Sequence, residues 1–156
     1  MELLDVQGKV EEAFDRVLRA HVDAGDYGTM QLIRRFFGLR PSLPRIAVVV
    51  DECDCSLRDE DGSPLQYHAA VRIELTSHGK DDGRKHDDVL ARIALDVYGG
   101  SAFVAKLNEV MAGEGFRALY WESDSGRSST KDGSYLKTTL TGNIELQPWD
   151  EVTNGN

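Results

Sequence analysis

The sequence lacks the features that mark several large classes of protein. It has only two cysteines among 156 residues, so disulfides cannot be its main source of stability. Cys53 and Cys55 are separated by a single residue, and a bridge over so short a span would be strained. No apolar run approaches the ~20 residues that a membrane-spanning helix needs. The first five residues lack the basic region and apolar run of a signal peptide, so we expect an intracellular protein without a membrane partner.

Positive charge is also scarce. The chain has 27 acidic and 18 basic residues, which gives a formal net charge of −9. A surface that binds phosphates should carry an excess of basic side chains, because the nucleic-acid backbone is an anion. The composition therefore argues against sequence-specific nucleic-acid binding.

Familiar motifs of catalysis are missing as well. No serine lies in a Gly-x-Ser-x-Gly elbow, and neither cysteine has a histidine nearby in the sequence. The stretch Gly113-Glu-Gly115 lies between an expected helix and an expected strand, which is the wrong order for a dinucleotide fingerprint. We therefore expect no catalytic residue and no cofactor.

Metal-binding patterns are equally weak. The four histidines, His21, His68, His78 and His86, show no ligand spacing, and we expect His78 and His86 to be exposed in a charged connector. The stretch from Asp51 to Cys55 places three acids at the end of a strand but lacks the spacing and glycine of a calcium loop. We interpret it as a solvated strand end with two small, partly buried cysteines, and we expect no bound metal.

What the sequence does contain is a clear order of apolar patterns. Helical spacing marks residues 6–20, 87–97 and 101–111, with a short helical turn at 30–37. Strand patterns cover residues 45–53, 67–77, 116–123 and 135–146, with polar loops at 59–64 and 124–133. This order predicts one α+β domain over residues 1–156, with a polar tail from about residue 150. We expect an antiparallel or mixed sheet of about four strands with the helices packed on one face.

The order of these segments resembles that of the tail terminator proteins of long-tailed bacteriophages. The similarity runs from Val10 to Gln147 and begins with the amphipathic N-terminal helix and the strand that contains Ile46-Ala-Val-Val-Val50. It continues through Val71-Arg-Ile-Glu-Leu75 and a charged loop to the helix Asp88-Val-Leu-Ala-Arg-Ile-Ala-Leu95. Two final segments complete it: Phe116-Arg-Ala-Leu-Tyr-Trp-Glu122 and the long strand that begins at Tyr135.

This resemblance implies a structural virion protein rather than an enzyme. Such a protein forms a homo-oligomeric ring, a hexamer, that caps the tail tube, ends tail polymerisation and faces the head–tail connector or stopper protein. It would be assembled in the host cytoplasm and end at the tail–neck junction, where DNA passes through the ring. We predict that the contact with a neighbouring subunit or the tail tube uses two strands and the loop at residues 123–134, with these residues: Ile46, Val48, Val50, Arg127, Lys131, Tyr135, Lys137 and Thr139.

Three alternatives stay open at this point. One is another phage neck component, such as a head–tail joining protein. A second, from a different class, is a small α+β enzyme or ligand-binding domain with a cleft lined by Asp51, Glu52 and His68. A third is a regulator that imitates the charge of nucleic acid, which would need a continuous acidic stripe.

Overall fold

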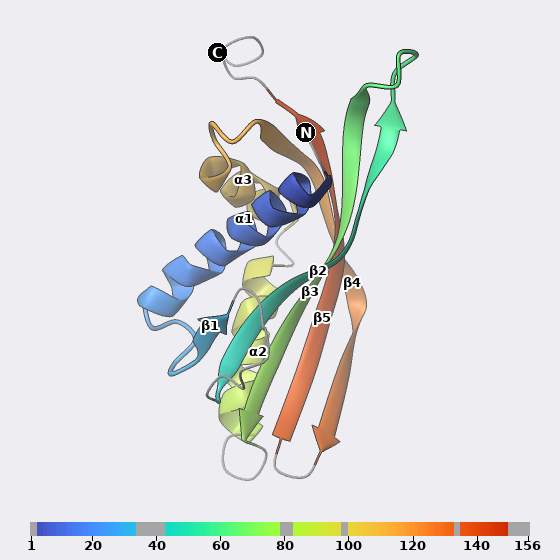
Figure 1. The fold of residues 1–156 in the computed structure, drawn as a ribbon. Coiled ribbons are helices and arrows are strands. Elements are labelled where there is room, and N and C mark those ends of the chain that lie inside the picture. Colours follow the sequence, from blue (N-terminus) through green and yellow to red (C-terminus); the bar gives the residue numbers. More distant parts are fainter. Residues whose placement is uncertain (1–2, 34–42, 79–82, 98–99, 133–134, 150–156) are drawn as a thin grey trace.

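Within the residues that the structure describes, three helices cover one face of a mixed five-stranded sheet (Figure 1). The computed structural model describes residues 3–33, 43–78, 83–97, 100–132 and 135–149, except for the side chains of residues 3, 4, 33, 83 and 125–132. The elements in chain order are α1 (Leu3–Asp23), β1 (Gln31–Ile33), β2 (Arg45–Arg58), β3 (Pro64–His78), α2 (Gly83–Val97), α3 (Ser101–Val110), β4 (Phe116–Asp132) and β5 (Tyr135–Pro148). The α+β fold is confirmed, with five strands instead of about four.

The order of strands in the sheet is β1-β2-β3-β5-β4. β1 runs parallel to β2, and every other neighbouring pair is antiparallel. The extra strand is β1. We expected a helical turn at residues 30–37, and for residues 31–33 this expectation is wrong, while residues 34–37 lie outside the described part. The three residues of β1 pair with Arg45–Ala47, and Leu32 is buried. A short apolar run suits a helix or a strand equally, and here the edge of β2 supplies its backbone partners.

β4 is longer than expected. The polar stretch that we expected to form a loop at residues 124–133 belongs to this strand as far as Asp132, which pairs with Tyr135 of β5. A register shift between Ser123 and Arg127 accommodates Asp124, Ser125 and Gly126. Ladder hydrogen bonds join backbone groups, so a polar composition does not prevent a strand when a long partner is available.

β2 and β3 also extend beyond the expected strands, and their hairpin projects past the body of the molecule (Figure 1, top). We call residues 56–66 the arm. At its turn the carboxylate of Asp59 accepts hydrogen bonds from the backbone N–H groups of Asp61, at 2.9 Å, and Ser63, at 2.8 Å. The turn is therefore tightly closed, whereas we had expected a long loop here.

The core lies between the helices and one face of the sheet. The expected alternation in β3 is confirmed, because Ala69, Val71, Ile73 and Leu75 are all buried. An aromatic cluster joins α1, α3 and β4: the ring centroid of Phe14 lies 5.1 Å from that of Trp121 and 5.4 Å from that of Phe103. The indole N–H of Trp121 donates a hydrogen bond of 3.0 Å to the carbonyl of Val97 at the end of α2.

Gly142 in β5 provides the space for this indole. An added Cβ at that position would lie 2.3 Å from Cη2 of Trp121 and 2.9 Å from the carbonyl oxygen of Glu122. Real Cβ atoms do not approach other atoms so closely, so the ring lies directly against the backbone of β5. The glycine is required by this contact.

A buried histidine fastens α2 to the sheet. Nδ1 of His86 lies 2.8 Å from the hydroxyl of Ser77 in β3, and Nε2 lies 2.9 Å from the hydroxyl of Thr138 in β5. Our expectation that His86 is exposed is therefore wrong, while His78 is exposed as expected. Burial lowers the pKa of His86, so the ring is held in its neutral form.

Candidate functional site

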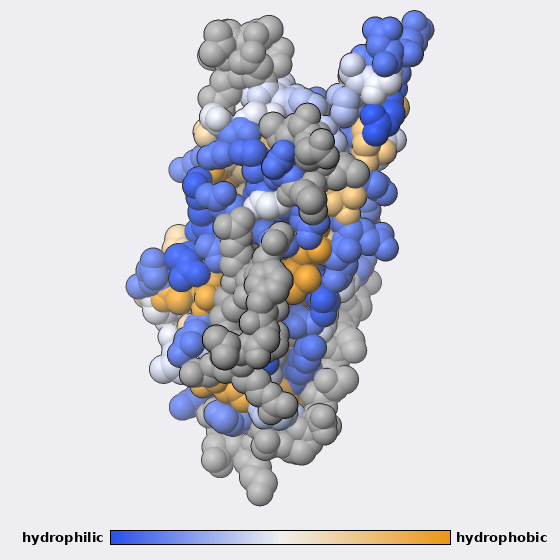
Figure 2. All heavy atoms as spheres, viewed as in Figure 1, coloured by the Kyte–Doolittle hydropathy of each residue, from blue (hydrophilic) through white to orange (hydrophobic). Residues whose placement is uncertain are grey.

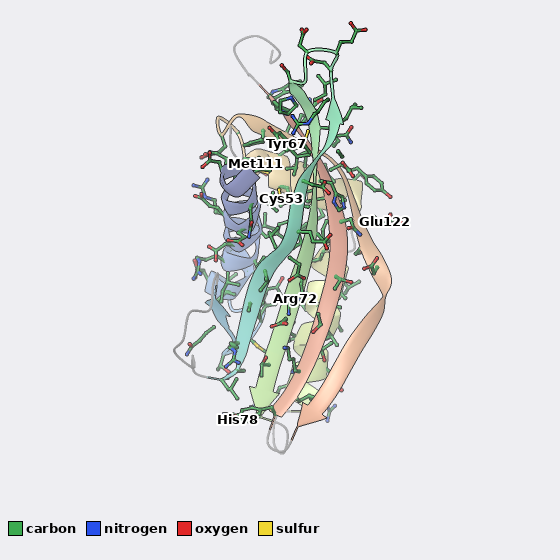
Figure 3. All side chains as sticks on the ribbon, turned by 45° about the vertical axis from the view of Figure 1, so that its right-hand side comes forward. Cys53, Tyr67, Arg72, His78, Met111 and Glu122 are labelled. Carbon is green, nitrogen blue, oxygen red and sulfur yellow. The ribbon has the colours of Figure 1, made fainter. Side chains whose placement is uncertain are left out.

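The face of the sheet opposite the helices carries a network of charged side chains (Figure 3). Arg72 lies at its centre and donates two hydrogen bonds of 3.0 Å to the carboxylate of Asp51 on β2. It also pairs with Glu74, which Lys137 of β5 approaches to 3.2 Å. The hydrogen bonds from Arg72 to Asp51 raise the pKa of the guanidinium further. Three neighbouring strands are thus linked on this face by ion pairs.

A second polar group lies nearer the arm. Nε2 of His68 lies 2.9 Å from the amide oxygen of Asn143, and its Nδ1 lies 3.8 Å from Asp54. Glu145 accepts hydrogen bonds from Gln66, at 3.0 Å, and from Ser56, at 3.2 Å. Each of these side chains is held by a neighbour across the sheet, which makes the surface a rigid polar layer.

The sequence suggested a cleft lined by Asp51, Glu52 and His68, but none of these residues lines the cavities at Asp26 and Trp149. Asp51 is engaged by Arg72, His68 is engaged by Asn143, and Glu52 is exposed next to a bulge in β2. Cys53 and Cys55 pack against the edge of the core, and burial raises the pKa of the Cys53 thiol. Within the described residues, no group of three or more His, Cys, Asp or Glu side chains is arranged to hold a metal ion.

The residues expected at an oligomer contact fall into three groups. Ile46, Val48 and Val50 are buried beneath the helices, because β2 turns these alternate side chains toward the core, so they cannot contribute directly to a contact. On the same strand Ala47 and Val49 lie on the uncovered face.

The second group is accessible. Lys137 and Thr139 lie on the uncovered face of β5, and Tyr135 is exposed at the start of that strand. The third group, Arg127 and Lys131, is described only by its backbone, which pairs with Leu140 and Leu136 of β5. The predicted contact residues of β5 therefore lie on or beside the uncovered face, whereas those of β2 face the helices.

Two amide side chains contact the backbone of the outer strands, a feature that the sequence did not reveal. Asn108 of α3 accepts a hydrogen bond of 2.7 Å from the backbone N–H of Ala118 in β4 and donates one of 3.1 Å to its carbonyl. Gln7 of α1 donates a bond of 3.4 Å to the carbonyl of Val50 in β2. The partners are 10 residues apart for Asn108 and 43 residues apart for Gln7, and no helical or strand periodicity predicts either contact.

Exposed apolar side chains gather on the arm and on β4. Leu57 and Leu65 of the arm are 51% and 45% exposed, and Leu119 and Tyr120 of β4 are 44% and 49% exposed. The tip of the arm is hydrophilic (Figure 2, upper right), so the two leucines lie below a charged turn. Contact of these side chains with another protein would bury apolar surface, which favours association.

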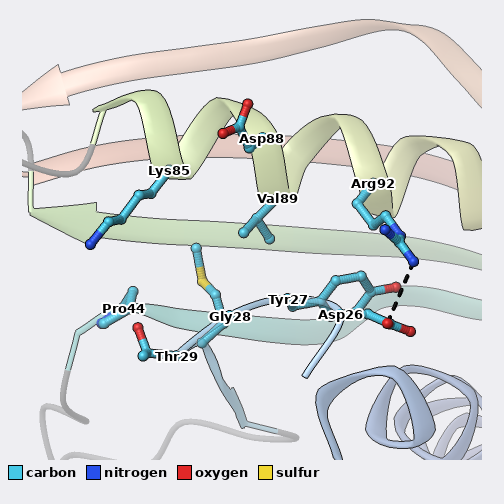
Figure 4. A pocket seen from close by; sticks show the side chains of 10 residues that line it. Asp26, Tyr27, Gly28, Thr29, Pro44, Lys85, Asp88, Val89 and Arg92 are labelled. Carbon is cyan, nitrogen blue, oxygen red and sulfur yellow. Dashed lines mark hydrogen bonds and ion pairs between the residues drawn. The ribbon is translucent and has the colours of Figure 1, made fainter. Parts of the chain in front are cut away.

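The largest cavity described here, of about 340 Å³, lies between the segment after α1 and the outer side of α2 (Figure 4). Asp26, which lines this cavity, lies 3.4 Å from Arg92 on the opposite wall and 2.8 Å from Nδ1 of His21. The hydrogen bond from His21 lowers the pKa of Asp26. The hydroxyl of Tyr27 donates a hydrogen bond of 2.7 Å to Asp96, and burial together with this carboxylate raises the pKa of the phenol. These contacts hold the end of α1 against α2.

A smaller cavity, of about 180 Å³, lies beside the end of β5 and is lined by Asn108, Phe116, Arg117 and Trp149. The guanidinium carbon of Arg117 lies 4.6 Å from the centroid of the Trp149 ring, a cation–π distance. This contact covers one face of the indole at the outer side of the sheet.

The fold and these surfaces define a single α+β domain with one polar, uncovered sheet face. A solved structure whose name carries no functional description has the same fold, with a TM-score of 0.56 over 93% of this chain and 98% of that chain. The two sequences are 14% identical, so this likeness concerns the fold alone. No protein-family model matches the chain, and no curated protein is significantly similar to it. No helix within the described residues is long and apolar enough to span a membrane.

Proposed function

We propose that the protein is a structural subunit of a phage tail, a tail terminator that works as a closed homo-oligomeric ring, most simply a hexamer. The observation that carries the proposal is the arm, a strand pair that leaves the body of the subunit and keeps Leu57 and Leu65 about half exposed. An extension of this kind contributes little to the stability of its own domain. It is well suited to reach a neighbouring subunit or the end of a tail tube.

The charge of the uncovered face supports the same function. Acidic side chains outnumber basic ones there: Asp51, Glu52, Asp54, Glu74, Glu122 and Glu145 against Arg45, Arg72, Arg117 and Lys137. A ring that turns this face inward presents a negative lumen, which repels the DNA that must pass through without sticking. The opposite orientation would leave the helices inside and the charged network against solvent.

The proposed activity is assembly rather than catalysis. The ring stops polymerisation of the tube protein on one side and meets the head connector or stopper protein on the other, at the tail–neck junction. A head–tail joining protein is the second candidate, because it too would be an acidic ring; it would bind filled heads and leave bare tube ends free.

Purified tail tubes test the proposal. The wild-type protein should bind at one end of each tube, as seen by electron microscopy, and the variant Leu57→Ser with Leu65→Ser should lose at least tenfold in binding. Leu95→Ser is the matched control, because Leu95 is 77% exposed on α2, away from the arm. Absence of binding at tube ends, together with normal tail lengths in phage that lack the protein, would refute the proposal. Binding to heads alone would favour the joining protein.

A further inference from the structure

Within the described residues, β2 and β4 each have a long stretch with no neighbouring strand on one side. β1 covers β2 only at Arg45–Ala47, and β4 is the last strand on the other side. Within the described part of the chain, residues 48–58 of β2 and all of β4 therefore have a strand on one side only. Sheet edges are commonly protected by proline or lysine, and neither residue occurs at 48–58 or 116–123.

Side chains from the helices contact the backbone at one point of each edge and leave the neighbouring residues of the strand uncovered. Asn108 occupies the outer backbone groups of Ala118, and Gln7 reaches the carbonyl of Val50. Register shifts follow directly, after Val50 and after Ala118, and again after Cys55 and after Ser123. Between these shifts lie two regular four-residue stretches, which we call the β2 edge (residues 52–55) and the β4 edge (residues 120–123).

The two edges lie at the same level of the sheet. One row of paired residues crosses the sheet from the β2 edge to the β4 edge, and its members are Glu52, Ala70, Asn143 and Glu122. The row that contains Asp54 and His68 ends at Tyr120. A rotation about an axis along the strands keeps this level unchanged, so the β4 edge of one copy meets the β2 edge of the next.

Strand direction satisfies the same operation. β2, β3, β5 and β4 alternate in direction, so β2 and β4 are antiparallel to each other. A rotated copy keeps its strand directions relative to the axis, and β4 next to the β2 of a second copy therefore continues the antiparallel alternation. A repeated head-to-tail contact of this kind closes into a ring when it involves a rotation alone, with no shift along the axis, and these two edges are then no longer open.

We infer that the β4 edge of one copy of this chain pairs with the β2 edge of the next copy, so that one antiparallel sheet runs around the ring. The inference rests on the closed ring of the proposed function, and it adds which surfaces of neighbouring copies close that ring. The exposed side chains of Leu119 and Tyr120 on one edge and of Leu57 beside the other are then covered by the neighbouring copy.

The charges of the two edges regulate this contact. Glu52 and Asp54 on one side approach Glu122 on the other, and like charges across a strand pair oppose association. Salt screens this repulsion, since the Debye length falls from roughly 30 Å at 0.01 M to about 8 Å at 0.15 M ionic strength. Subunits at low salt therefore remain apart, and rising salt or a tail-tube template brings them together.

Cross-linking tests the pairing. In a background with Cys53→Ala and Cys55→Ala, the double variant Asp54→Cys with Tyr120→Cys is oxidised at 0.15 M salt, with and without tail tubes. We expect a ladder of covalent products that ends at the closed ring, because neighbouring strands bring Cα atoms within disulfide range. The pair Glu52→Cys with Tyr120→Cys samples a register shifted by two residues, and a ladder from either pair supports the inference.

Two control variants should give no ladder of covalent products. Thr139→Cys with Tyr120→Cys places one thiol in the middle of the sheet and should give no ladder. Tyr120→Cys alone can only form dimers through two equivalent β4 edges, and abundant dimers from it would overturn the inference in favour of a twofold pairing. Circular dichroism of each variant confirms that the fold is retained.

The failure of the inference differs from that of the proposed function. Ladders that end at a closed ring but do not bind tail tubes would leave the edge pairing intact and refute the tail terminator. Binding at tube ends by a protein that gives no ladder with either cysteine pair would refute the edge pairing alone.

Discussion

Gly142→Ala should destabilise the fold strongly for so small a change. The new methyl group would lie 2.3 Å from Cη2 and 2.6 Å from Cζ2 of Trp121, so the indole must move. It is confined by Phe14 and Phe103 and by its hydrogen bond to Val97. Overpacking typically costs about 1–3 kcal/mol and a lost hydrogen bond about 1 kcal/mol, while the alanine recovers about 0.4–1 kcal/mol of chain entropy.

The expected net loss is therefore about 2–3 kcal/mol in the free energy of unfolding. For a domain of this size that corresponds to a fall of about 4–12 °C in the melting temperature. Urea titration followed by far-ultraviolet circular dichroism measures it. Gly8→Ala is the matched control: Gly8 lies in α1 with open space at the Cβ position, and the same change should raise stability by about 0.5–1 kcal/mol.

A double-mutant cycle tests the cause. Phenylalanine lacks the two indole atoms that the methyl group would meet, so Trp121→Phe should remove the part of the cost of Gly142→Ala that comes from the indole and leave only the milder contact with the Glu122 carbonyl oxygen. The two changes should then be strongly non-additive. A Gly142→Ala protein as stable as the wild type, or additive losses in the double variant, would refute the close contact.

Three further predictions concern side chains that join elements. Burial lowers the pKa of His86 in the folded protein, so below the ordinary histidine pKa of 6.5 the unfolded chain takes up a proton first and the wild-type protein loses stability. His86→Gln should make this loss between pH 7 and pH 5 smaller. Urea midpoints at the two pH values measure it, with His78→Gln as the control. Asn108→Ala should cost about 2 kcal/mol by removing two hydrogen bonds to β4, and an unchanged urea midpoint would contradict that role. Asp51→Asn should cost less than about 1 kcal/mol, because its pair with Arg72 is partly exposed; a much larger loss in the same titration would show that the network stabilises the fold.

The parts of the fold that sequence predicted well depend on local periodicity. The alternation from Ala69 to Leu75 and the apolar stripe of α1 both repeat at the spacing of their element, and both are buried as that spacing requires. Their one-sided character also predicted that the helices cover one face of the sheet. Burial of one face leaves a regular trace in a short segment, and a single sequence is enough to detect it.

The parts that sequence missed depend on distant partners. The pattern could not show that Leu32 would join the edge of β2, or that the polar second half of β4 would pair with β5. His86 looked like an exposed connector residue because its partners, Ser77 and Thr138, are 9 and 52 residues away. For the uninterrupted apolar run from Ile46 to Val50, composition could not decide which alternate side chains face the helices.

The two tryptophans give the molecule a pair of internal optical reporters. Trp121 is sealed among aromatic rings in the core, whereas Trp149 lies at the outer side of the sheet against the guanidinium of Arg117. Indole emission shifts to longer wavelength in a polar environment, and an external quencher reaches only the accessible ring. Replacing either indole with phenylalanine would separate the two signals, so that one follows the integrity of the core and the other follows events at the surface near β4, with no attached dye.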